Sequence, residues 1–206
     1  MKKVENNRPV CHATDSVDPR VRRTQKLLHD ALRSLLQTRR LYAISVQDIA
    51  ECATVNRATF YAHYLDKEDL AISLLKTDLR TALMERYAAP PPLTSDNIVE
   101  FATIVFEFLG NLQSNCPETG KDLQDLTSTV LQDELYEIIE HWLSDSGARS
   151  RLFPGARKEV VATVLSWSIY GGAYRWARSD RTIPATQICR EIVTLVLSSS
   201  LIVETR

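Results

Sequence analysis

The chain has 206 residues, 44% of them hydrophobic, and a formal net charge of −1. Its longest uncharged run, residues 160–174, includes Thr, Ser and two Gly and is shorter than the roughly 20 apolar residues that a membrane span needs. Four scattered cysteines without a secretion signal indicate reduced thiols. We therefore expect a cytoplasmic protein that makes no contact with a membrane.

The small net charge conceals two segments of opposite sign. Residues 20–64 contain eight Lys and Arg against three acids, whereas residues 96–145 contain eleven acids against a single Lys. The net charge of +5 in the first segment suits contact with phosphates, and the net charge of −10 in the second would repel them. The chain has only six glycines and few runs in which β-branched residues alternate with polar ones, and this scarcity favours an all-α fold.

The first residues of the chain differ from the rest. Residues 1–17 are polar and have no packing face, and we expect a disordered arm there. Asp18 and Pro19 then open a helix, because Asp can cap a first turn and Pro fits the first helical position. In the link to the next helix, Tyr42 and Ile44 are expected to pack into the core.

The stretch 45–70 contains three helix-start signals. In each, a small polar residue is followed three positions later by a residue that can complete the cap; the pairs are Ser45 with Asp48, Asn56 with Thr59, and Asp66 with Asp69. They predict short helices near 46–53 and 57–64 and a long helix from 67. Two short helices joined by a tight turn are typical of a helix-turn-helix, whose second helix enters the major groove.

Three runs of this stretch, VQDIA at 46–50, NRATFYAHY at 56–64 and DKEDL at 66–70, carry a family resemblance. Together they resemble the DNA-binding signature of TetR/AcrR-family transcriptional regulators, and with the preceding helix the likeness covers roughly residues 20–75. It implies a three-helix DNA-binding domain followed by a larger helical domain for effector binding and dimerisation. Two positions depart from the family pattern, since Thr54 stands where glycine is preferred and Ala62 where a longer polar residue is commoner.

The predicted DNA-binding residues are Ser45, Asn56, Arg57, Thr59, Tyr61, His63 and Lys67. Arg57 can make a bidentate contact with guanine, and Thr59 can approach a thymine methyl group or a phosphate. The resemblance implies that Tyr61 and His63 donate to phosphate oxygens, although either side chain could instead pack. Lys67, at the start of the long helix, can reach a phosphate with help from the positive end of that helix.

The rest of the chain is expected to form helices near 67–88, 95–113, 121–144, 155–178 and 184–203, with a loop at 147–154. We divide the chain into a DNA-binding domain at 18–66 and an effector-binding and dimerisation domain at 67–206. The last two helices are apolar over more of their circumference than one core needs. Pairing of these helices with those of a second copy would bury the excess, which is also the homodimer that the resemblance implies.

Four aromatic residues are candidates for an effector pocket: Trp142, Trp167, Tyr170 and Tyr174. Packing in the core or the dimer interface is the alternative role for each. The acidic, aromatic character of this part of the chain would suit a cationic or aromatic effector. We expect no cofactor, no metal site and no enzyme, because the His and Cys residues lack metal-ligand spacing and no nucleotide-binding or nucleophile motif occurs.

The predicted function is that of a sequence-specific transcriptional regulator. It would act as a repressor that binds a double-stranded operator DNA with a palindromic sequence. Binding of a small-molecule effector would release the protein from this operator. A DNA-binding regulator without a ligand, controlled by a protein partner, is the alternative. The sequence does not distinguish a repressor from an activator.

Overall fold

The computed structural model describes residues 18–87, 91–115, 121–144 and 146–199. In this part of the chain the structure is all-α, as predicted, with nine α-helices, one 3-10 turn and no strand. The elements are α1 (Pro19–Leu36), η1 (Leu41–Ala43), α2 (Val46–Cys52), α3 (Arg57–Tyr61), α4 (Lys67–Arg86), α5 (Ser95–Asn115), α6 (Lys121–Trp142), α7 (Ser146–Leu152), α8 (Lys158–Ala177) and α9 (Ala185–Ser199). The predicted arm at 1–17 lies outside the described residues.

The predicted helix starts are confirmed by their caps. The Asp18 carboxylate accepts the Arg20 amide, with Pro19 in the first turn. Ser45 and Asp48 form a reciprocal capping box at the start of α2. Asp66 accepts the Asp69 amide at α4. These side chains satisfy backbone N–H groups that have no partner within their own helices.

Two sequence-based boundaries were wrong. Helix α3 ends at Tyr61 and leaves His63 beyond it, and its Asn56 cap accepts the amide of Ala58 instead of that of Thr59. Residues 147–154, predicted as a loop, contain most of α7. Helix α9 is described as far as Ser199, so the predicted end at 203 lies outside the described residues.

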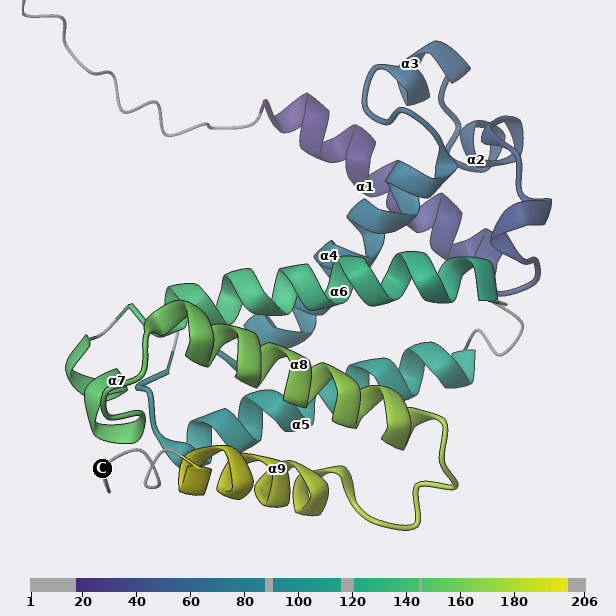
Figure 1. The fold of residues 1–206 in the computed structure, drawn as a ribbon. Helices are drawn as coiled ribbons and strands as arrows, with labels where there is room; N and C mark the ends of the chain where they lie inside the picture. Colours follow the sequence, from purple (N-terminus) through teal and green to yellow (C-terminus); the bar gives the residue numbers. More distant parts are fainter. Residues whose placement is uncertain (1–17, 88–90, 116–120, 145, 200–206) are drawn as a thin grey trace, which may run out of the picture.

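Two hydrophobic cores share one helix. The N-terminal core joins α1 to α4 and includes Leu28, Ile49 and Phe60, whereas the C-terminal core joins α4 to α9. Along α4 the change occurs between Leu74, which packs in the first core, and Leu75, which packs in the second. Figure 1 shows α4 leaving the N-terminal helices and passing behind α6. The domain division at residues 66 and 67 stays a prediction.

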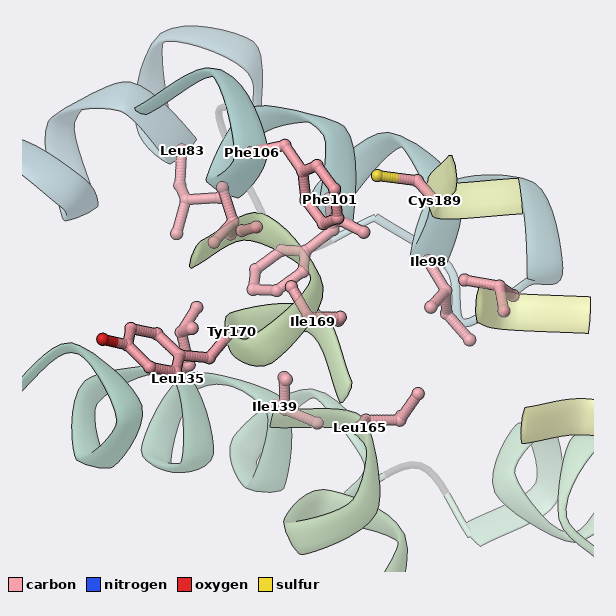
Figure 2. Close-up of a cluster of buried hydrophobic side chains, with 14 of the residues drawn as sticks. Leu83, Ile98, Phe101, Phe106, Leu135, Ile139, Leu165, Ile169, Tyr170 and Cys189 are labelled. Atoms are coloured by element: carbon pink, nitrogen blue, oxygen red, sulfur yellow. The ribbon is translucent and has the colours of Figure 1, made fainter. Parts of the chain in front are cut away.

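The C-terminal core is a layered helical bundle in which α8 packs on α5 and α6 and α9 packs on α5 and α8. Figure 2 shows its buried side chains: Leu83, Ile98, Phe101, Phe106, Leu135, Ile139, Leu165, Ile169, Tyr170 and Cys189. Side chains of α9 and α5 approach α8 closely at Gly172, and the glycine leaves room for them. A Cβ there would lie 2.5 Å from the Ile192 Cδ1 atom and 2.9 Å from the Phe106 ring. Among the described helices, none is both long and apolar enough to span a bilayer.

Candidate functional site

The segment α2–α3 presents a short exposed helix on a buried base. Phe60 and Tyr64 are buried in the N-terminal core. On the other side, Arg57 and Tyr61 are exposed, whereas Thr59 is half-buried. The structure therefore leaves the Arg57 and Tyr61 side chains available to an external partner, as a reading helix requires.

The remaining predicted contact residues fall into two groups. Ser45 and Asn56 are exposed and occupied as helix caps, and the Ser45 hydrogen bonds are the main cause that lowers the pKa of Asp48. His63 is half-buried beyond the end of α3, beside the Tyr64 ring. The first half of α1 also exposes four cationic side chains that suit phosphate contact: Arg20, Arg22, Arg23 and Lys26.

Lys67 has a role that the sequence did not reveal. Its ammonium donates to the backbone carbonyls of Leu41, Tyr42 and Ile44 at 2.9, 3.1 and 2.9 Å. An ammonium has three N–H donors, so in this geometry all of them are used within the protein. The structure thus favours Lys67 as a support for η1, and its predicted phosphate contact remains untested.

The turn η1 itself was predicted only in part. Ile44 is buried, as expected, but Tyr42 is 66% exposed, so the prediction that it packs in the core was wrong. The carbonyls of η1 turn inward to Lys67, while the phenol of Tyr42 remains in solvent directly before the capped start of α2. Tyr42 is therefore an additional polar group available to a partner at this face.

The turn between α2 and α3 contains an unusual backbone. Thr54 has a φ angle of 57°, in the left-handed region that β-branched residues rarely adopt. Its neighbours hold it there, because the amide of Val55 donates to the carbonyl of Ala50 at 2.9 Å and closes the end of α2. The departure from the family's glycine is therefore accommodated with backbone strain, on the order of 1–3 kcal/mol.

A buried polar group fixes α1 to the segment after α3. His29 Nε2 lies 3.1 Å from the Tyr64 hydroxyl and 3.1 Å from the Ser73 hydroxyl of α4. Burial lowers the pKa of His29, an effect that Asp78 opposes. No pattern in the sequence marks this contact, because a single His within a helix gives no signal of its distant partners.

A cavity of about 560 Å³ opens between α4 and α6. Its walls are mainly apolar and aromatic; the lining residues are Arg80, Leu83, Met84, Tyr87, Pro91, Phe101, Glu137, Ile138, His141 and Trp142. The size and character are those of small-molecule sites in proteins. Burial and then the adjacent Glu100 carboxylate raise the pKa of Tyr87 to about 12, so the phenol is neutral at ordinary pH.

The structure separates Trp142 from the other three aromatic residues that the sequence proposed for a pocket, Trp167, Tyr170 and Tyr174, whose rings adjoin along α8. Trp142 lines the α4–α6 cavity, where its indole N–H donates to the carbonyl of Pro91 at 2.6 Å. Tyr170 is buried in the C-terminal core, with its ring stacked on that of Tyr174 at 6.1 Å. Trp167 is 57% exposed on α8. None of these three lines the cavity.

The same side of α4 carries an ion cluster with α6. The Glu134 carboxylate is fully buried, accepts Nε–H of Arg80, and lies 3.3 Å from Nζ of Lys76. Arg80 also lines the cavity, 4.0 Å from Glu137. One side chain of α4 therefore touches both the cavity and the buried carboxylate that fastens α4 to α6.

An apolar stripe lies on the exposed side of α8. Val160, Val164 and Trp167 are exposed at spacings of four and three residues, which places them on one helix face. Gly171 continues this face, and a Cβ there would meet nothing within 4 Å. On α9, Leu195 is exposed as well. Exposed apolar side chains that gather on one face mark interaction surfaces.

The described residues contain no group of three or more His, Cys, Asp or Glu side chains placed to hold a metal ion. The geometry that stands out is instead a short helix, α3, with exposed Arg57 and Tyr61, and an apolar cavity against α4.

Comparison with known proteins matches residues 28–74 to the family described as bacterial regulatory proteins, tetR family. An uncharacterised HTH-type transcriptional regulator, YxbF of Bacillus subtilis (strain 168), is 38% identical over 61 residues, which cover 29% of this chain and 16% of YxbF. The dhaKLM operon transcriptional activator DhaS of Lactococcus lactis subsp. lactis (strain IL1403) is 34% identical over 55 residues, 27% of this chain and 29% of DhaS. Both matches thus span less than a third of the relative.

Solved structures resemble the whole fold. The fatty acid degradation regulator FadR from Bacillus halodurans has a TM-score of 0.59 and 17% identity, covering 84% of this chain and 94% of that one. FadR from Bacillus subtilis, solved in complex with stearoyl-CoA, has a TM-score of 0.57 and 17% identity, covering 84% and 97%. At such identities the likeness establishes the fold alone.

Proposed function

The chain belongs to the TetR family of bacterial transcriptional regulators, and we propose that it binds a palindromic DNA operator as a homodimer from which a small-molecule effector releases it. The observation that carries the effector part is the position of α4. This helix contributes to the N-terminal core that supports α3, and it also forms one wall of the α4–α6 cavity. A ligand in the cavity contacts the helix that positions the reading domain.

In the proposed complex, α3 lies in the major groove. Arg57 reads a guanine edge, and Thr59 approaches a base or phosphate beside it. Tyr61, His63, Ser45 and Asn56 contact the backbone. The cations of α1 add sequence-independent attraction, which predicts binding that weakens strongly with salt.

The dimer is proposed to form through α8 and α9. The stripe of Val160, Val164 and Trp167 supplies an apolar surface, and Gly171 permits a close helix approach. A two-fold symmetric pair would present two α3 helices at a fixed separation and therefore require two half-sites. On α8, Tyr174 follows this surface, and the Arg178 guanidinium lies 5.4 Å from the centre of its ring.

The effector is proposed to be a mostly apolar small molecule in the α4–α6 cavity, because aromatic and aliphatic side chains form most of its wall. The ligand acts only if its affinity differs between the DNA-competent conformation and another one. The structural relative FadR was solved with stearoyl-CoA, which makes an apolar effector a natural class to test here. The cavity favours this reading over a ligand-independent regulator.

Release by an effector describes a repressor, whereas the partial relative DhaS is an activator. Reporter transcription from the natural promoter, with and without this protein, decides between the two directions of control. The DNA-binding proposal is the same for both.

The test is a mobility-shift titration with DNA from the chain's own upstream region at several salt concentrations. We expect a sequence-selective shift by a dimer that weakens as salt rises. Arg57→Ala should reduce the preference for the operator over a half-site mutant by about 1–3 kcal/mol, since it removes a base contact. Arg151→Ala, an exposed Arg on α7, is the matched control and should bind like wild type. Binding without sequence preference would overturn the proposal.

A further inference from the structure

A second cavity lies at the seam between the two hydrophobic cores. It has a volume of about 480 Å³, and three helices contribute its wall. The lining residues are Arg33, Leu36 and Gln37 from the end of α1, Ala71, Leu74, Leu75 and Asp78 from α4, and Phe108, Asn111 and Leu112 from α5. The cavity is separate from the one between α4 and α6, with which it shares no lining residue.

The apolar part of this wall comes from both cores. Leu36 and Leu74 pack in the N-terminal core, whereas Leu75, Phe108 and Leu112 pack in the C-terminal core. Helices α1 and α5 each pack on α4, which forms the floor between them. A molecule in the cavity therefore contacts the DNA-reading unit and the C-terminal bundle at the same time.

The charges of the lining are already paired. The Arg33 guanidinium lies 2.7 Å from the Asp78 carboxylate and 2.7 Å from that of Asp30. Among the lining residues Arg33 and Asp78 cancel, whereas Asp30 does not line the cavity and its side chain is about half exposed to water. An ionic ligand would break this pair or leave its own charge without a partner, and both are unfavourable in a partly desolvated site. The charge balance selects an uncharged ligand.

Two amide side chains provide the polar contacts that remain. Gln37, directly after α1, and Asn111, near the end of α5, both line the cavity and are exposed. Neither side-chain amide has a hydrogen-bond partner among the described residues. Each offers N–H donors and a carbonyl acceptor, which suit a hydroxyl or carbonyl group.

We propose that the cavity between α1, α4 and α5 binds an uncharged, mostly apolar small molecule that carries a hydroxyl or carbonyl group. It is a second ligand site, at the joint between the two units. Its effect on DNA rests on the proposed function: an occupant holds α1 against α5 and so shifts operator affinity if the DNA-bound conformation changes that spacing.

The experiment uses one probe scaffold in three charge states: 2-naphthol, 2-naphthoate and 2-naphthylmethylammonium. Each is titrated calorimetrically into the full chain at neutral pH without DNA. We expect 2-naphthol to bind with a Kd below about 1 mM and both ions to bind at least about tenfold more weakly. No binding of 2-naphthol, or equal binding of either ion, would overturn the proposal.

Two tryptophan variants locate the bound probe. Leu112→Trp fills the seam cavity and should remove the part of the 2-naphthol binding that discriminates against the two ions, whereas Met84→Trp fills the α4–α6 cavity and is the matched control that should retain that part. The reverse pattern refutes a seam site. Circular dichroism checks folding, and if Leu112→Trp is unfolded, the exposed pair Gln37→Ala and Asn111→Ala decides, with binding expected to weaken at least about threefold.

Operator binding is measured separately in the same variants. A chain that shifts its operator but does not bind 2-naphthol retains the proposed function and loses the seam site. A chain that binds 2-naphthol but no operator keeps the seam site and contradicts the proposed function. The two proposals therefore fail independently.

Discussion

The Tyr64 hydroxyl lies 3.1 Å from Nε2 of His29, so a residue just beyond the reading helix is tied to α1 through a buried hydrogen bond. The Ser73 hydroxyl of α4 lies 3.1 Å from the same nitrogen. Three elements of the DNA-reading unit thus converge on one imidazole. Burial is the largest influence on the pKa of His29 and lowers it; Arg33 acts in the same direction, and together they outweigh Asp78 and Asp30, which raise the pKa.

This arrangement predicts a loss of stability in mild acid. The pKa of His29 in the folded state is below its ordinary value of 6.5, so the unfolded chain takes up the proton first as pH falls. The contribution is fully present above pH 6.5 and is lost progressively below it. Urea unfolding between pH 7.5 and 5.5 should show this slope, and His29→Gln should flatten it. His141→Gln, at an exposed site on α6, should keep the wild-type slope.

The left-handed Thr54 predicts a stabilising substitution. Thr54→Gly should raise the free energy of unfolding by about 1 kcal/mol, because relief of backbone strain exceeds the extra entropy of the unfolded glycine. Thr81→Gly, at an exposed position inside α4, is the control and should destabilise by about 0.5 kcal/mol. A Thr54→Gly protein less stable than wild type in urea would contradict the strain argument.

Lys67 allows its two possible roles to be separated. Lys67→Met keeps most of the side-chain length but removes the donors to the carbonyls of Leu41, Tyr42 and Ile44, in and directly after η1, so we expect about 2 kcal/mol of destabilisation. If that is its main role, the salt dependence of operator binding stays unchanged. A phosphate contact would instead lower the slope of log K against log salt by about 1 with little change in stability.

The buried Glu134 predicts an asymmetry between partners. Replacing both cations, Lys76→Met with Arg80→Met, leaves a buried carboxylate unpaired and should cost about 3 kcal/mol or more. Glu134→Gln leaves two cations that are partly exposed to water, and we expect a smaller cost of about 1–2 kcal/mol. Urea unfolding of the variants measures both. Equal losses would show that burial of Glu134 does not dominate.

Local signals in the sequence determined the all-α fold, the helix starts and the reading segment. A cap such as Ser45 with Asp48 acts within one turn, and its residues are neighbours in the chain. The amphipathic spacing of α1 likewise needs no knowledge of what it packs against. The ends of helices were less predictable: Phe60 and Tyr64, four residues apart, suit one face of a longer helix, yet α3 ends at Tyr61 and Tyr64 is buried from the segment beyond it.

The tertiary structure alone decided which side chains meet. Lys67 and Ile44 are 23 residues apart, and no local pattern marks an ammonium that will support a distant turn. Trp142 and Trp167 look alike as aromatic residues on helices, yet one lines a cavity and the other faces solvent. The difference arises because the packing of α4 against α6 fixes the cavity, and that packing depends on contacts between residues far apart in the chain.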